Sequence, residues 1–413
     1  MLANYIKTAL KVLRRRKFFT FISLFGISFT LVVLMVAVAM LDNVFSPRQP
    51  ESRFDHVLGV HTVGLYGPHF GMTTNPGYGF INQYVRGLKD VENMSLFTTS
   101  SPLTMYHEGR KIDTHLRRTD GAYWQILDFK FLEGGPFTEE DNRNANFVAV
   151  ITDEMRRTLF NGQSALGRTI ELDGQRFRVI GVVPAVAITR NVGFSEVWAP
   201  VGTLKTREHE KRMIGDFGAI VLARSPRDFA AIRREFKERL ANFVFEDPKN
   251  FDRVEAGLDT PFELVARNMI GNQYQGNRVL VLQAILVLMA LLFVTLPTMN
   301  LVSINLSRIL ERASEIGVRK AFGASSVTLI GQFVVENVVL TLIGGAIGFV
   351  LSVLALSAVA RLEIVPFAVF DVNLRIFGYG VLLSAAFGII SGVYPAWRMS
   401  RMQPVNALRG GVL

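Results

Sequence analysis

The sequence of 413 residues contains no cysteine. A disulfide-rich secreted module and a thiol nucleophile are therefore both excluded, and ordinary core burial must stabilise the fold. Histidine is scarce, and no two histidines have the i, i+3 or i, i+4 separation of a zinc site, so we predict neither a metal site nor an enzyme. The six histidines are His56, His61, His69, His107, His115 and His209. No G-x-x-x-x-G-K-[ST] phosphate loop occurs, so we expect this chain not to bind ATP itself.

Charged residues are missing from long stretches, and the first of these, residues 18–41, has none. A helix needs about 20 apolar residues to cross a bilayer, and four segments meet that length. The predicted spans are residues 18–41, 279–302, 327–360 and 376–397. The first run exceeds the about 7–15 apolar residues of a signal peptide, so we interpret it as a retained anchor.

Lysine and arginine gather beside these spans and predict their orientation. Basic residues dominate three segments: residues 1–17, 303–326 and 398–413. We therefore place both termini and the middle loop in the cytoplasm, and residues 42–278 and the short loop 361–375 outside. The net charge of +10 then reflects membrane orientation and lipid contact, and no nucleic-acid partner is predicted.

The outer region predicts a mixed α/β domain, so the fold class is a membrane protein of four transmembrane helices plus a large α/β extracytoplasmic domain. Strand–helix–strand pieces at 43–120 and 201–275 enclose a β-rich module at 121–200. Strands are predicted at 57–65, 217–223, 250–258, 147–151 and 177–183, and helices at 78–91, 154–160 and after Ser225-Pro226. Asp173-Gly174 between apolar runs predicts a hairpin turn.

The third span carries unusual residues. Gly344, Gly345 and Gly348 allow close helix approach, and they suit either packing within one bundle or a dimer seam. Glu336 lies inside the same span. An ionisable group at that depth either forms a structural pair or acts in the mechanism.

Between the second and third spans lies "SEIGVRKAFGAS", residues 314–325. From Leu306 to Lys320 the apolar residues recur at helical spacing, while alternating acidic and basic residues occupy another face. One reading is a helix lying in the lipid headgroups. The other is a docking helix that a cytoplasmic partner grips, which the mixed charges favour.

Four stretches resemble MacB/FtsX-type ABC transporter permeases. "RASEIGVRKAFGASS" (312–326) resembles their cytoplasmic motif, and "GIISGVYPAWRMSRMQPVNALRGG" (388–411) their C-terminal signature. "QFVVENVVLTLIGGAIGFVLS" (332–352) is similar to their third span. The stretch from "FLEGGPFTEED" to "FRVIGVV" (131–183) resembles their periplasmic core domain.

The resemblance implies that the short helix is a coupling helix docked on a separate ABC ATPase, which holds ATP and Mg²⁺, while this chain holds no cofactor and is a non-catalytic subunit. The implied docking residues are Arg308, Glu311, Arg312, Glu315, Ile316, Gly317, Arg319 and Lys320. Gly323 and Ala324 would form the turn that re-enters the membrane. A second permease chain, identical or a paralogue, is also implied.

The implied function is mechanotransmission in a bacterial inner membrane. ATP hydrolysis on the partner would move the periplasmic domain and export a drug, peptide, lipid or lipoprotein, with a periplasmic adaptor and an outer-membrane duct as further partners. Two alternatives stay open at this point. One is an FtsX-like regulator that activates a cell-wall hydrolase, and the other is a lipoprotein-release permease like LolC/LolE.

Overall fold

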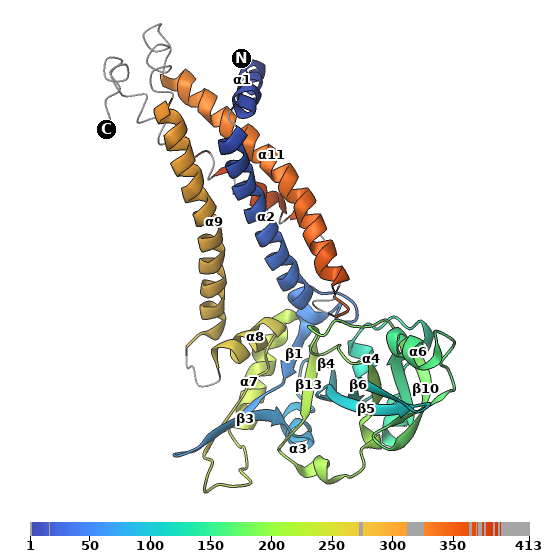
Figure 1. Cartoon of the computed structure of the whole chain (residues 1–413). Helices are drawn as coiled ribbons and strands as arrows, with labels where there is room; N and C mark the ends of the chain where they lie inside the picture. The colour runs from blue at the N-terminus through green and yellow to red at the C-terminus, as the bar shows by residue number, and fades with distance from the viewer. Residues whose placement is uncertain are drawn as a thin grey trace. The chain divides into compact units, whose positions relative to one another are not determined.

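A computed structural model describes residues 2–15, 17–271, 276–311 and 326–362, together with residues 366–368, 370, 374–375, 377–382, 385–386 and 389. The chain divides into two compact units, each of which is described by itself (Figure 1). The helical unit comprises Met1–Asn43, Gln283–Ile364 and Val369–Leu413. The α/β unit comprises Val44–Leu282 and Val365–Ala368.

Long helices make up the described part of the helical unit: α1 (Leu2–Arg15), α2 (Lys17–Phe45), α9 (Arg278–Glu311) and α11 (Ser326–Arg361). Two stretches are long and apolar enough to cross a membrane, Lys17–Phe45 and Val334–Arg361. They correspond to the first and third predicted spans. The apolar stretch measured in α9 is shorter, Arg278–Phe293. Most of 376–397 lies outside the described residues, so the second and fourth spans stay predictions.

Helices α2 and α11 pack closely where the glycines lie. A Cβ added at Gly344 would come within 2.9 Å of Ile27, and one at Gly348 within 3.2 Å of Leu31. Ile27 and Leu31 are buried together with Leu340. Small residues thus let two helices approach inside a single chain. This contact accounts for Gly344 and Gly348 without a second subunit.

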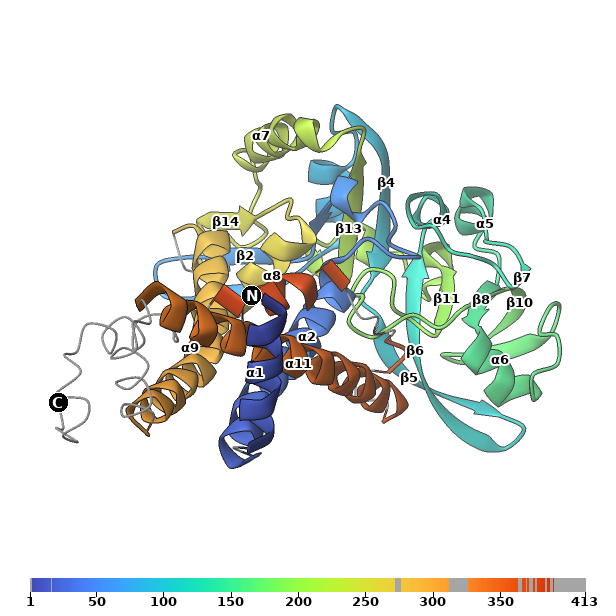
Figure 2. The same ribbon diagram turned by 90° about the horizontal axis from the view of Figure 1, so that it is seen from above.

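The α/β unit is built on a ten-stranded sheet with the order β1-β13-β4-β6-β11-β8-β10-β7, in which β5 also pairs with β6 and β9 with β10 (Figure 2). The strands are β1 (Val57–Val60), β4 (Val91–Thr98), β5 (Ser101–His107), β6 (Arg110–Thr119), β7 (Glu133–Gly134), β8 (Val148–Thr152), β9 (Thr169–Leu172), β10 (Gln175–Val183), β11 (Val197–Pro200) and β13 (Phe217–Ala223). Alternate residues of β13 face opposite sides, so Ala219 and Val221 enter one hydrophobic core while Ile220 and Leu222 enter another.

A second sheet has the order β12-β3-β2-β14. Its strands are β2 (Val63–Tyr66), β3 (Gly71–Pro76), β12 (Ile214–Gly215) and β14 (Arg253–Ala256). The helices of the unit are α3 (Tyr78–Phe80), α4 (Tyr123–Ile126), α5 (Glu139–Arg143), α6 (Asp153–Phe160), α7 (Phe229–Leu240) and α8 (Pro261–Ile270), with shorter helical turns η1 (Phe54–His56), η2 (Ile81–Val85), η3 (Val201–Thr203), η4 (Glu208–Lys211) and η5 (Pro226–Asp228).

Several predicted elements are confirmed. Strand β13 occupies the predicted residues, and α7 follows a capping box at Ser225 with Ile232, Phe236 and Leu240 buried. Positive φ angles of 51° at Asp173 and 72° at Gly174 form the predicted hairpin turn between β9 and β10.

Two local predictions are wrong. The helix predicted over 78–91 ends at Val85, because Gly87 adopts a φ of +72° and β4 begins at Val91. The single strand predicted over 57–65 is two strands, β1 and β2, which belong to different sheets. The apolar residues of 57–65 correctly predicted strand structure, but they do not reveal that the strand is interrupted between Val60 and Val63.

The two predicted modules share one sheet. We call residues 43–120 and 201–275 the base module and residues 121–200 the insert. Strand β6 of the base module pairs in parallel with β11 of the insert. Strands β4 and β6 are joined through a single residue pair, Phe97 with Thr119. Few residues therefore pair between β4 and β6, close to the point where the chain enters the insert.

Candidate functional site

The segment that follows α2 is fixed to the α/β unit by a buried ion pair. Arg190 Nη1 donates to the carbonyl of Ser46 at 2.8 Å and to Glu51 Oε2 at 3.2 Å. Glu51 Oε1 accepts from the Gly193 backbone N–H at 2.8 Å. The Arg190 and Glu51 side chains are 4% and 0% exposed. Burial raises the pKa of the Glu51 carboxyl, an effect that the Arg190 charge opposes.

The segment that leads toward α9 is fixed beside it. Gly59 and Asp259 exchange two backbone hydrogen bonds of 2.8 Å. The Asp259 carboxylate also accepts from Arg267 Nη2 at 2.8 Å. Helix α8 begins shortly after Asp259. Thr260 and Glu263 form its capping box, and Pro261 occupies its first turn. The rings of Phe45 and Phe262 lie 5.2 Å apart, so the entry and exit segments of the unit are in contact.

We call this region the junction and define it as residues 44–61, 189–193 and 257–267. Behind it lies Arg117 of β6, which is 2% exposed. Its Nη2 donates to the carbonyl of Asn191 at 2.7 Å, and its guanidinium group lies 4.9 Å from the centre of the Phe97 ring. Arg117 Nε and Nη1 have no hydrogen-bond partner among the described residues.

His61 is partly buried beside this layer, with its ring 5.9 Å from that of Phe97. Burial, assisted by the charge of Arg117, lowers the pKa of His61 to about 4. The imidazole is therefore neutral at pH 7. Tyr123 holds the neighbouring loop, since its hydroxyl donates to the carbonyl of Val192 at 2.7 Å. Burial raises the pKa of Tyr123 to about 12, so this donor keeps its proton.

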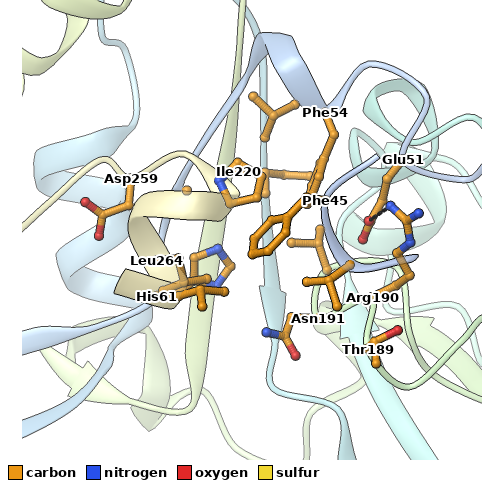
Figure 3. A pocket seen from close by; sticks show the side chains of 16 residues that line it. Phe45, Glu51, Phe54, His61, Thr189, Arg190, Asn191, Ile220, Asp259 and Leu264 are labelled. Atoms are coloured by element: carbon orange, nitrogen blue, oxygen red, sulfur yellow. Dashed lines mark hydrogen bonds and ion pairs between the residues drawn. The ribbon is translucent and has the colours of Figure 1, made fainter. Parts of the chain in front are cut away.

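A small pocket lies inside the junction (Figure 3). Phe45 and Ile220 lie near its centre, Glu51 and Arg190 face each other on one side, and Asp259 lies on the other. Its free volume of about 30 Å³ has room for about one water molecule. The pocket is too small for a cargo molecule. The charged groups here bind one another and the backbone, so the arrangement is suited to holding segments together.

The histidines are separated in space as well as in sequence. No group of three or more His, Asp or Glu side chains that could hold a metal ion occurs in the part of the chain that the structure describes. His115 Nδ1 lies 3.1 Å from Glu196 Oε2, and the His209 ring stacks 5.7 Å from Phe217.

The residues predicted for the docking helix are only partly covered by the structure. The backbones of Arg308 and Glu311 lie in the last turn of α9. The others lie outside the described residues: Arg312, Glu315, Ile316, Gly317, Arg319, Lys320, Gly323 and Ala324. Glu336 is 4% exposed in α11. The structure therefore leaves the docking helix and its turn as predictions.

The sequence did not point to the junction. Glu51 and Arg190 are 139 positions apart; Glu51 stands in a polar stretch typical of a surface loop, whereas Arg190 follows an apolar one. A local signal that could have placed α8 is Thr260 and Pro261 followed by Glu263, the pattern of a capping box with proline in the first turn, but no helix was predicted there.

Comparison with protein families agrees with the architecture. The model of the MacB-like periplasmic core domain matches residues 20–239, and that of the FtsX-like permease C-terminal region matches residues 286–404. The chain belongs to the MacB/FtsX-type ABC transporter permeases. This confirms the predicted family, and the ABC permease family implies an ATPase partner.

Among curated relatives, the chain is 26% identical over 338 residues to the uncharacterized ABC transporter permease YknZ of Bacillus subtilis, covering 80% of this chain and 79% of YknZ. It is 25% identical over 430 residues to the macrolide export ATP-binding/permease protein MacB of Sodalis glossinidius, covering 97% of this chain and 59% of that protein. The permease thus spans well under two thirds of the length of that MacB.

Solved structures with some likeness include the extracellular domain of YknZ from Gram-positive bacteria, at 20% identity and a TM-score of 0.36, covering 48% of this chain and 98% of that one. The periplasmic region of MacB from Actinobacillus actinomycetemcomitans gives 15% identity and a TM-score of 0.37, with coverage of 54% and 94%. In the permease described here, the α/β unit corresponds to the extracytoplasmic part of the family.

Proposed function

We propose that this chain is a non-catalytic permease subunit that passes movement from an ATPase on one side of the membrane to its α/β unit on the other. The observation that carries the proposal is the junction. The backbone after α2 is held by Arg190 at Ser46, and the backbone before α8 is held by Gly59 at Asp259. Both segments are thus bonded to the α/β unit, one to the loop between β10 and β11 and the other to β1.

We expect the junction to be stiff, because its charged groups bond one another and the backbone around a very small cavity. A cavity of about 30 Å³ leaves little space for the side chains to rearrange. Pulling α2 along its axis would act on Ser46 and on the Glu51–Arg190 pair, and so on the loop of the insert that carries Arg190. Movement of α9 would act through α8 and Asp259.

The remaining parts of the scheme are proposals that rest on family membership. ATP and Mg²⁺ would be bound by a separate ATPase that grips residues 308–320, and two permease chains would act together in the inner membrane with both termini in the cytoplasm. The cargo would be a drug, peptide, lipid or lipoprotein taken up outside the cytoplasm. A hydrolase regulator and a lipoprotein-release permease would use the same junction, so the identity of co-purifying proteins must separate them.

The docking step is tested by purifying the tagged permease from native membranes and identifying bound proteins by mass spectrometry. We expect an ABC ATPase with the wild type and its loss in Glu315→Lys, because the family resemblance implies that Glu315 contacts the ATPase and the substitution reverses its charge. Glu171→Lys, the same reversal at an exposed position of the α/β unit, is the matched control. An ATPase retained by Glu315→Lys would contradict docking through this helix. Co-purified cargo, an adaptor or a cell-wall hydrolase would identify the function served.

The transmission step is tested separately by hydrogen–deuterium exchange of the permease–ATPase complex with and without ATP. We expect ATP to change exchange in residues 44–61 and 257–267. The double variant Phe45→Ala/Phe262→Ala should abolish this change while ATPase binding persists, because the ring contact is lost. Tyr106→Ala, which removes an exposed ring elsewhere, should behave as wild type. An unchanged response in the double variant would refute transmission through the junction.

A further inference from the structure

A second hollow of the α/β unit is very different from the junction. It lies between the base module and the insert and has a volume of about 1000 Å³, at the upper end of the range of small-molecule sites. Met94 and Leu96 of β4 line it from the base module, and Asn142 and Arg143 of α5 line it from the insert. We call it the cleft. Its lining includes the backbone of both places where the chain crosses between the modules.

Helix α5 is bonded to both crossings. The Gly121 N–H donates to Glu139 Oε2 and the Gly202 N–H donates to Asn142 Oδ1, each at 2.9 Å. A Cβ at Gly121 would lie 2.2 Å from the Glu139 nitrogen, and one at Gly202 would lie 2.0 Å from the Asn142 oxygen. Both crossings therefore pack directly against α5. A ligand bound at the end of α5 would therefore contact the helix that is hydrogen-bonded to both segments joining the modules.

The cleft offers apolar surface to a ligand. Met94, Tyr78 and Leu204 are only partly buried although they pack against the main core of the base module. Phe147 of the insert is 44% exposed. Partly exposed aromatic and aliphatic side chains that line one hollow give an apolar chain something to bury against.

The acidic groups of the cleft are already engaged. Asp120 accepts from the Ser95 hydroxyl at 2.6 Å and from the Leu96 N–H at 3.0 Å. Glu139 accepts from Gly121, and Glu210 lies 3.8 Å from Arg207. These carboxylates keep their negative charge, but their oxygens already accept hydrogen bonds or face Arg207, so they are held in place within the protein.

Two cations of the cleft are not engaged. Arg86 follows η2 in the base module, and Arg143 is the last residue of α5 in the insert. Both side chains are exposed, and among the described residues neither has a carboxylate within 4 Å. Lys205, by contrast, is paired with Asp173 at 2.9 Å. The cleft is lined by four basic side chains, Arg86, Arg143, Lys205 and Arg207, and by three carboxylates, Asp120, Glu139 and Glu210, so its net charge is +1. The two guanidinium groups without a carboxylate partner in the described part of the chain come one from each module.

We propose that the cleft binds an anionic amphiphile, with its apolar chain over Met94, Leu204 and Phe147 and its acidic headgroup in the field of Arg86 and Arg143. Guanidinium groups form charge-assisted hydrogen bonds with such headgroups, which are about twice as strong as neutral ones. This inference names a class of cargo and in that sense rests on the proposed export function. The binding itself needs neither the ATPase nor the membrane helices to move.

The test uses the full chain in nanodiscs of zwitterionic phospholipid and a diazirine-bearing fatty acid with a free carboxylate. After illumination, labelled peptides are identified by mass spectrometry, so that probe dissolved in the lipid is separated from probe in the cleft. We expect labels on the peptides that contain Met94 and Leu204. In Arg86→Gln/Arg143→Gln this labelling should fall by about ten-fold or more, since each lost charge-assisted bond is worth about that factor.

Arg227→Gln/Arg234→Gln, which removes two exposed arginines outside the cleft, is the matched control and should label like the wild type. Dodecanoate should compete with the probe, and dodecyltrimethylammonium, which has the same chain and the opposite charge, should not. Labelling confined to the membrane helices, equal yields in the two double variants, or equal competition by both detergents would each overturn the proposal. Labelling of the cleft with a failed Glu315→Lys experiment would refute the coupling scheme and leave the binding site standing.

Discussion

The junction and the cleft belong to the same unit and use the same kinds of side chain in opposite ways. In the junction, Arg190 and Glu51 are 4% and 0% exposed and bond to each other around a cavity of about 30 Å³. In the cleft, Arg86 and Arg143 are exposed beside a volume of about 1000 Å³. In the junction the charged side chains bond to each other and to the backbone, whereas in the cleft the two arginines are exposed to solvent.

The difference shows how one sheet can serve two tasks. A mechanical connection works best where side chains have no alternative positions, which dense packing and mutual bonding ensure. A binding region needs open volume and groups whose partners are absent until a ligand arrives. Strand β6 links the two regions, because Arg117 stands behind the junction while Asp120, directly after the strand, lines the cleft.

The largest expected effect comes from breaking the junction's ion pair. Arg190→Ala leaves Glu51 buried without its cation, and losing one partner of a buried pair costs about 3–5 kcal/mol of unfolding free energy. We expect a clear fall in the melting temperature of the detergent-solubilised permease. The exposed counterpart Arg143→Ala should leave the melting temperature almost unchanged, since surface changes are usually within about 0.5 kcal/mol. Equal effects of the two substitutions would remove the distinction between the regions.

The next effect concerns His61, a partly buried residue of the junction. Its folded-state pKa of about 4 lies below the ordinary 6.5, so its contribution to stability is full above pH 6.5 and is lost as the pH falls toward 4. The whole shift corresponds to about 3 kcal/mol. We expect His61→Gln to lose less stability than the wild type between pH 7 and pH 4, as measured by melting temperature. A parallel pH dependence in both proteins would show that His61 titrates normally.

Asp120 beside the cleft should behave in the opposite sense. Burial, only partly offset by hydrogen bonds from Ser95 and Leu96, raises the pKa of Asp120 to about 6, above the ordinary 3.8. Its contribution is therefore full below pH 3.8 and is lost as the pH rises through 6, again by about 3 kcal/mol at most. Asp120→Asn should remove the increase in unfolding free energy that this carboxyl contributes when the pH falls from 7 to 4, as measured by melting temperature.

The two titrations offset each other in the wild type, so a shallow pH dependence is expected there and steeper, opposite slopes in the two single variants. The double variant His61→Gln/Asp120→Asn should return to a shallow slope. Slopes of the same sign in both single variants would contradict the opposite burial effects assigned to these groups.

Local sequence patterns were sufficient for much of the fold. The capping box at Ser225 and the apolar spacing of Ile232, Phe236 and Leu240 placed α7, and Asp173-Gly174 placed a hairpin turn. These signals work because caps, turns and amphipathic faces depend on residues within a few positions of one another. The helix predicted over 78–91 failed where Gly87 adopts a positive φ, a backbone choice that the apolar spacing does not encode.

The sequence alone was enough to predict the apolar helices at Lys17–Phe45 and Val334–Arg361, the α/β character of residues 44–282 and the family, because each follows from composition, periodicity or contiguous motifs. Only the tertiary structure decided that base module and insert share one sheet through β6 and β11. It also decided which arginines are buried and which are free. Arg190 stands in a largely apolar stretch and Arg143 in a polar one, but neither stretch identifies a partner. The fold brings Glu51, 139 positions away, to Arg190 and leaves Arg143 exposed beside open volume.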